Sequence, residues 1–176
     1  MKRLIVYNSK TGFTKKYANW IAEEIDCDVE LYKNIDRINI NEYDLLIFGS
    51  RIHAGKIEYF NKIRAFVENN KIKHFIIFVI GGHPNAVEKE NSELWTNNLT
   101  ENEIKNIPHF YFQGGLNYEK MGLSDKIIMK TVSFFLNKDT LKDKDKTGIR
   151  VDTRNSYDIS SKEYIKPLVD HIQKEI

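Results

Sequence analysis

The stretch RLIVYNSKTGFT, residues 3–14, joins a short apolar run to a loop of small hydroxyl residues. The apolar run predicts a strand over Arg3–Asn8, because it is rich in β-branched side chains and a turn-forming segment follows it. Beyond the loop, which contains Gly12, apolar residues recur at helical spacing from Thr14 onward. A strand, a glycine-containing loop and a helix in this order predict the start of a β–α–β unit.

Apolar runs and helical periods keep alternating along the rest of the chain. We expect five strands, at Arg3–Asn8, Cys27–Tyr32, Asp44–Gly49, His74–Ile80 and His109–Gln113. Helices are expected from about Thr14, at Glu58–Asn69, at Ala86–Leu99 and after a capping box, Ser160-x-x-Glu163. The alternation predicts an α/β fold with a doubly wound five-stranded parallel sheet, strand order 2-1-3-4-5, and helices on both faces.

Three of these helices carry a clear apolar face for the sheet. The first is expected to bury Tyr17, Ala18, Ile21, Ala22 and Ile25. The second is expected to bury Tyr59, Phe60, Ile63, Phe66 and Val67, and the last Tyr164, Ile165, Leu168, Val169 and Ile172.

Length and composition exclude several classes of protein. With 176 residues, 41% of them hydrophobic, the chain can bury a core, and we expect one domain over 1–176 with an extended helix-plus-loop segment at about 114–158. The net charge of +2 is too small to indicate nucleic-acid binding. Cys27 is the single cysteine, which fits a reducing compartment, and no metal site is expected. No apolar stretch approaches the roughly 20 residues that cross a bilayer, so a cytoplasmic protein is expected.

A doubly wound sheet binds ligands beyond the carboxyl ends of strands 1 and 3, where the winding reverses. After strand 1, hydroxyls and the amides of a helix N-terminus favour a bound phosphate. The alternative is an ordinary turn in which Thr14 is the helix N-cap, and the residues alone leave both open. Other phosphate sites are excluded, because the chain lacks G-x-x-x-x-G-K-[ST], G-x-G-x-x-G and a Cys six positions before an Arg. A phospho-receiver domain is excluded too, since Gly49 and Ser50 stand where it needs a carboxylate.

The pattern Ser-x-Thr-Gly-x-Thr after the first strand resembles the flavin mononucleotide (FMN) phosphate loop of the flavodoxin family. The loop Gly49–Gly55, followed by Phe60 and a helix, resembles the branch that contains the menaquinone-dependent protoporphyrinogen IX dehydrogenases. The stretch Gly114–Tyr118, followed by Asp125–Lys130, resembles the same branch. This resemblance covers nearly the whole chain and implies a flavodoxin-like fold with FMN as the cofactor.

The resemblance also implies which residues bind the cofactor. The phosphate would be held by Ser9, Lys10 (through its backbone), Thr11, Gly12, Phe13 and Thr14. The isoalloxazine ring edges would lie against Ser50, Arg51, Ile52, His53, Ala54 and Gly55, and its pyrimidine side along Gly81, Gly82 and His83. Flavodoxins often place an aromatic residue where this chain has Arg51 and His53, and a cation there would favour the reduced anion. A surface role for His53 and a plain turn at Gly81–His83 stay open, and no catalytic acid or base is identified.

The segment Leu123–Leu136 has more apolar residues than one helix face can hold. The surplus could pack against the Asn137–Tyr157 loop. Alternatively it could offer an apolar surface, rimmed by lysines, to a quinone, a porphyrin or an anionic membrane face. Under that second interpretation, residues 123–138 are a peripheral contact with the inner face of the membrane.

Three functions are therefore compared. The first is an FMN-dependent oxidoreductase that passes hydride equivalents from a reduced porphyrin, protoporphyrinogen IX by resemblance, to a quinone. The second is a flavodoxin electron carrier that docks with redox partners and has no substrate of its own; such carriers use a strongly acidic face, which this slightly basic chain lacks. The third is a flavodoxin-like scaffold that has lost its flavin.

Overall fold

Five parallel strands form the centre of the computed structural model, which describes residues 1–82, 88–123, 126–127 and 155–176. They are β1 (Arg3–Tyr7), β2 (Asp28–Leu31), β3 (Leu45–His53), β5 (His74–Gly81) and β6 (His109–Gln113). Their order across the sheet is β2-β1-β3-β5-β6, which confirms the predicted doubly wound order. The strand order reverses at β1 and β3, so the loops that follow these strands diverge to opposite faces of the sheet.

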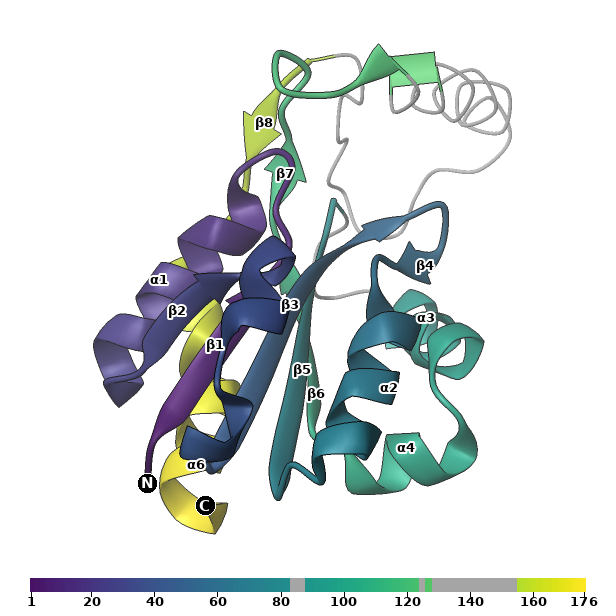
Figure 1. Cartoon of the computed structure of the whole chain (residues 1–176). Coiled ribbons are helices and arrows are strands. Elements are labelled where there is room, and N and C mark those ends of the chain that lie inside the picture. Colours follow the sequence, from purple (N-terminus) through teal and green to yellow (C-terminus); the bar gives the residue numbers. More distant parts are fainter. Residues whose placement is uncertain (83–87, 124–125, 128–154) are drawn as a thin grey trace.

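Helices cover both faces of this sheet (Figure 1). The α-helices are α1 (Phe13–Ile25), α2 (Phe60–Asn70), α3 (Glu88–Asn98), α4 (Glu101–Asn106) and α6 (Lys166–Glu175). The 3₁₀ helices are η1 (Tyr32–Arg37), η2 (Ile40–Glu42) and η3 (Lys162–Ile165). The short strand β4 (Lys56–Ile57) pairs antiparallel with β3, and β7 (Gly115–Leu116) pairs with β8 (Tyr157–Asp158).

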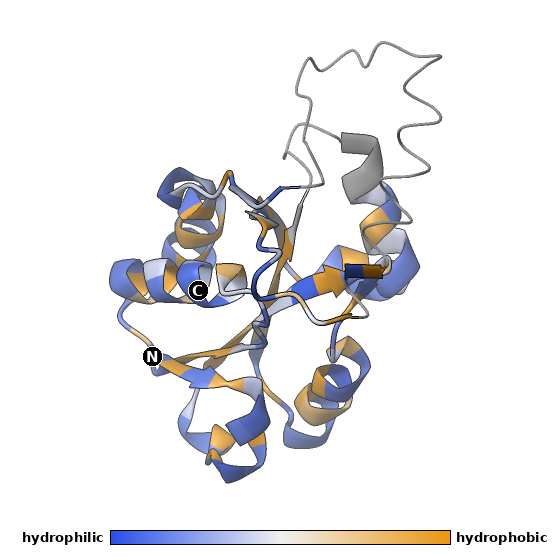
Figure 2. Ribbon diagram, turned by 90° about the horizontal axis from the view of Figure 1, so that it is seen from above, coloured by the Kyte–Doolittle hydropathy of each residue, from blue (hydrophilic) through white to orange (hydrophobic). Residues whose placement is uncertain are grey.

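The strands alternate their side chains between two apolar cores. On one face, Ile5, Ile47 and Phe78 pack with α1 and α6. On the other face, Leu4 and Phe48 belong to the core that contains the buried residues of α2 and α3. Figure 2 shows the hydrophobic strands between helices whose outward sides are hydrophilic.

Two helices differ from the expectation in detail. Helix α1 buries the expected residues except Ala22, which is only partly buried. Helix α2 begins at Phe60, not at Glu58, because Tyr59 adopts a left-handed conformation with φ 61° and ends the extended chain before it. As a result Tyr59 is 45% exposed instead of buried, and its ring stacks on Tyr32 with the centroids 4.6 Å apart. Phe66 and Val67, also expected to be buried, are only partly buried.

The third parallel strand is longer than predicted. It was expected to end at Gly49, but Ser50 and Arg51 continue the ladder to β5, and Ile52 and His53 pair with β4. Ala54 and Gly55, with φ of 49° and 75°, form the two-residue turn of this hairpin. The expected loop Ser50–Gly55 is therefore a strand end and a tight turn.

The C-terminal capping box was predicted wrongly. The Ser160 hydroxyl bonds to Asp158, and Ser161 instead accepts the amide of Glu163 at the start of η3. Helix α6 starts later, with Pro167 in its first turn, where proline costs no helical hydrogen bond. The short helix α4 was not predicted, although Thr100 and Glu103 form a complete capping box at its start.

Two expectations fall wholly or largely outside the described residues. His83 is one of them. The apolar segment Leu123–Leu136 is the other; of its described residues, Leu123 is 82% and Ile127 is 65% exposed. Within the described ranges, no helix is long and apolar enough to cross a membrane.

Candidate functional site

The loop after β1 leaves the first turn of α1 open toward the carboxyl edge of the sheet, the upper edge in Figure 1. Gly12 caps the helix with φ 103°, its amide donates to Ser9 Oγ (3.2 Å), and its carbonyl accepts the amide of Lys16 (3.0 Å). Among the described residues, no acceptor forms a hydrogen bond with the backbone amides of Phe13 to Lys15. Such unpaired amides and the positive end of the helix dipole attract an anion.

Thr14 contributes a hydroxyl to the same turn. The residue is only 2% exposed, and its hydroxyl has no hydrogen-bond partner in the part of the chain that the structure describes. Thr14 is not the N-cap, because that position belongs to Gly12, which has no side chain to cap with. A Cβ placed on Gly12 would meet nothing within 4 Å, so the loop is open on that side. The loop therefore fits a phosphate group, which supplies the acceptor oxygens that these donors lack.

The β3–β4 hairpin extends from β3, the strand next to β1, and carries the expected ring-binding residues. Ser50 is fully buried, and its hydroxyl donates to the Glu58 carbonyl (2.9 Å), so the hydroxyl is used inside the fold. Ile52 and His53 are half-buried at the end of β3, and the Ala54–Gly55 turn is exposed.

Arg51 forms an ion pair with Glu58 inside the hairpin. Its guanidinium donates to both carboxylate oxygens of Glu58, from Nε at 2.8 Å and from Nη2 at 2.6 Å. The pair is largely shielded, with the Arg51 side chain 16% and the Glu58 side chain 24% exposed. The positive charge expected next to a ring is therefore neutralised within the hairpin.

Glu58 and Asn8 were missed by the sequence interpretation. Asn8 Nδ2 donates to Glu58 Oε2 (2.7 Å), so one carboxylate joins the end of β1 to the hairpin. Partial burial alone would raise the pKa of Glu58, but the hydrogen bonds and charge of Arg51, with help from Asn8 and His53, outweigh it and lower the pKa. Asn8 had one available signal, its place directly after the first strand; nothing in the sequence marks Glu58.

This lowered pKa predicts an acid-sensitive contribution to stability. Glu58 has an ordinary pKa of 4.5 in the unfolded chain and a lower one when folded, so its contribution is complete above pH 4.5 and is lost as the pH falls through the folded-state pKa. We expect Glu58→Gln to lower the unfolding free energy at neutral pH and to flatten its fall below pH 4.5. Urea titrations across this pH range measure both; equal slopes for the two proteins would contradict the assignment.

Gly81 ends β5 at the same edge, directly after Ile80, which pairs with Arg51, and Gly82 follows the strand. The Gly81 carbonyl accepts the Gly114 amide (2.8 Å), and the Gly82 carbonyl accepts the Tyr157 hydroxyl (2.8 Å). A Cβ on Gly81 would lie 2.4 Å from the Tyr111 hydroxyl oxygen. A side chain at position 81 would therefore displace the Tyr111 ring, so close packing favours glycine here whether or not a ligand approaches it.

A hollow of about 470 Å³ opens between the start of α1 and the β7–β8 pair. Its lining includes Thr11, Gly12 and Phe13 from the phosphate-loop candidate. On its wall, Lys16 Nζ bonds to Asp158 Oδ2 (2.9 Å) and to Ser160 Oγ (2.8 Å). The hollow is thus bordered by an ion pair between α1 and β8.

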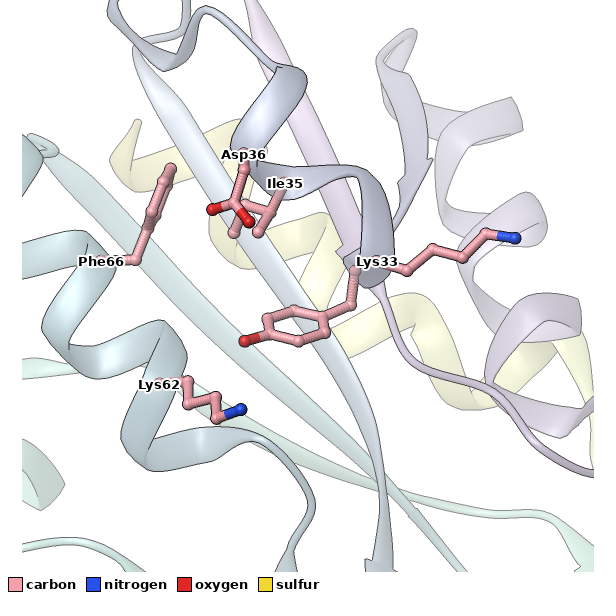
Figure 3. Close-up of a pocket in the computed structure, with 6 residues that line it drawn as sticks. Lys33, Ile35, Asp36, Lys62 and Phe66 are labelled. Carbon is pink, nitrogen blue, oxygen red and sulfur yellow. The ribbon is translucent and has the colours of Figure 1, made fainter.

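A second hollow, of about 360 Å³, lies between η1 and α2 (Figure 3). Its lining includes Asp36 from η1 and Lys62 and Phe66 from α2, and none of the expected site residues. Of the residues drawn in Figure 3, Lys33 points away from the others. The expected sites are therefore gathered at the carboxyl edge, apart from this hollow.

Comparisons with known proteins give one family model and several similar solved structures. A family model described as flavodoxin domain matches residues 4–145. No curated protein gives a significant match. Similar solved structures include an archaeal flavodoxin (16% identity, 65% of this chain and 85% of that chain, TM-score 0.41) and flavodoxin 2 from Bacillus cereus (20%, 63% and 84%, TM-score 0.41). Another is a flavoprotein from Lactobacillus acidophilus in complex with FMN (20%, 64% and 91%, TM-score 0.40).

Proposed function

The chain belongs to the flavodoxin domain family, and on this premise we propose that it is an oxidoreductase with FMN as its cofactor. The observation that carries the proposal is the open first turn of α1. There, backbone amides and the Thr14 hydroxyl, which have no hydrogen-bond partner among the described residues, lie at the edge at which a doubly wound sheet binds its ligand.

The residues of this chain would divide the binding between two regions. Ser9 to Thr14 would hold the phosphate through hydroxyls and amides. Residues 50–55 would border the ring with the β3–β4 hairpin, and Gly81, Gly82 and His83 would border its other side. The bound flavin would supply the electron-transfer chemistry, and the protein would anchor and orient it and leave one face accessible.

For the substrate, we propose a reduced porphyrin with a quinone as acceptor. Two observations support this substrate. Leu123 and Ile127, four positions apart in the sequence, are large and strongly exposed hydrophobic residues, which suits an apolar partner. The C-terminal third has a basic excess, which suits the anionic carboxylates of a porphyrin. The same surface would allow peripheral contact with an anionic membrane through residues 123–138. Each turnover moves two electrons and two protons from the porphyrinogen to the quinone.

An anaerobic assay tests this function. The FMN-loaded protein, given protoporphyrinogen IX and a menaquinone analogue, should produce porphyrin fluorescence well above that of controls that lack protein or quinone. Fluorescence equal to the controls would reject the porphyrin substrate. If there is no porphyrin fluorescence and the bound flavin takes up electrons in two separate one-electron stages, the protein is an electron carrier and not this enzyme. Protein that binds no added FMN would reject both functions.

A further inference from the structure

The Glu58 carboxylate connects the two loops that a bound cofactor would have to contact at once. It accepts two hydrogen bonds from Arg51, at the end of the β3–β5 ladder, and one from Asn8, directly before the phosphate-loop candidate. Its backbone is fixed as well, because its amide donates to the Arg51 carbonyl (3.2 Å) and its carbonyl accepts from Ser50 (2.9 Å). Glu58 therefore has little freedom to move relative to β3.

Asn8 connects Glu58 to the loop after β1 through hydrogen bonds. Its amide donates to the Gly49 carbonyl (2.9 Å), while its side chain reaches Glu58 (2.7 Å). The chain then turns into Ser9–Gly12 within a few residues. The direction in which the phosphate loop leaves the sheet is thus set by contacts to β3 and to Glu58.

Glu58 also neutralises the positive charge of Arg51. Arg51 and Glu58 are both mostly shielded from water, and their bidentate pairing cancels the charge of the guanidinium. Without the carboxylate, a partly buried cation would remain beside the ring-binding hairpin. Such a cation would stabilise the negatively charged reduced flavin and raise the midpoint potential.

We infer that Glu58 is a positioning residue for the cofactor: through Asn8 and Arg51 it holds the phosphate loop and the ring-binding hairpin at a fixed separation and keeps Arg51 neutralised. The inference rests on the proposed FMN binding. It assigns Glu58 no contact with the flavin.

The chain offers a matched control for an Arg–Glu pair without this role. Arg64 of α2 donates to both carboxylate oxygens of Glu103, from Nε at 2.5 Å and from Nη2 at 3.0 Å. This pair links α2 to α4, and neither residue belongs to the candidate site. Glutamine also satisfies a capping box, so Glu103→Gln removes the charge and leaves the start of α4 intact.

The experiment measures the FMN dissociation constant by quenching of flavin fluorescence and the midpoint potential by anaerobic titration, for the wild-type protein, Glu58→Gln and Glu103→Gln. Glu58→Gln should weaken FMN binding about tenfold and shift the potential upward, while Glu103→Gln changes neither. Charge alone predicts the opposite binding effect, since the Arg51 guanidinium, without the Glu58 carboxylate, would attract the phosphate dianion. The variant Arg51→Met/Glu58→Gln should return the potential toward the wild-type value and still bind weakly.

Asn8→Ala keeps the test decisive if Glu58→Gln does not fold. It removes the hydrogen bond from Asn8 to Glu58 and leaves the Arg51–Glu58 pair in place. It should weaken binding without moving the potential. Unchanged or tighter FMN binding in the folded Glu58→Gln protein, or in Asn8→Ala where that variant replaces it, would overturn this inference alone. A wild-type protein that binds no FMN would overturn the proposed function, and this inference with it.

Discussion

The double variant Thr11→Ala/Thr14→Ala should bind FMN about a hundredfold more weakly than the wild-type protein. A hydrogen bond to a charged group contributes about 1.5–3 kcal/mol, so the loss of two hydroxyl donors costs about 3 kcal/mol or more, which is two orders of magnitude in affinity. Thr14 matters most, because its hydroxyl has no partner among the described residues to satisfy it otherwise. Titration of the apoprotein with FMN measures the loss.

Two controls separate the hydroxyls from other effects. Thr11→Ser/Thr14→Ser keeps both donors and should retain most of the affinity. Thr96→Ala removes a threonine hydroxyl from the exposed face of α3, where it bonds only to backbone carbonyls of its own helix, and should leave FMN binding unchanged. Wild-type affinity in the double alanine variant would refute the phosphate assignment for this loop.

Gly49→Ala should destabilise the protein strongly, by about 3 kcal/mol, the upper end of the usual cost of overpacking. A Cβ at this position would lie 2.1 Å from Cζ of Phe78, and Phe78 is fully buried in a core that includes Phe112. The ring cannot move away without displacing its neighbours, because interiors are close-packed. For a domain of this size such a loss corresponds to a fall in Tm of about 6–12 °C.

A second substitution tests the stated cause. Phe78→Leu removes the ring that the new methyl group would meet, so Gly49→Ala should cost much less in a Phe78→Leu background than in the wild-type protein. Thermal unfolding of the four proteins gives this coupling. Costs that simply add would show that the destabilisation does not come from the contact with Phe78.

The framework of the fold was predictable because it depends on local patterns. The apolar run Arg3–Asn8 and the spacing of Tyr17, Ala18 and Ile21 each identify their element without knowledge of any other part of the chain. The hydroxyl-rich loop with Gly12 was predictable for the same reason. The prediction failed where a tertiary contact replaced a local one. The Ser160 hydroxyl donates to Asp158 and accepts from Lys16, so it does not cap the helix.

The sequence by itself therefore determined the α/β class, the order of the parallel strands and the loop that is the candidate for phosphate binding, since hydrophobic periodicity and turn residues act over a few positions. Only the tertiary structure decided that β3 runs on to His53, that the charge of Arg51 is cancelled, and that Asn8 and Glu58, fifty positions apart, meet at the candidate site. Their contact depends on which strands become neighbours, and that follows from packing of the whole chain rather than from any short stretch of it.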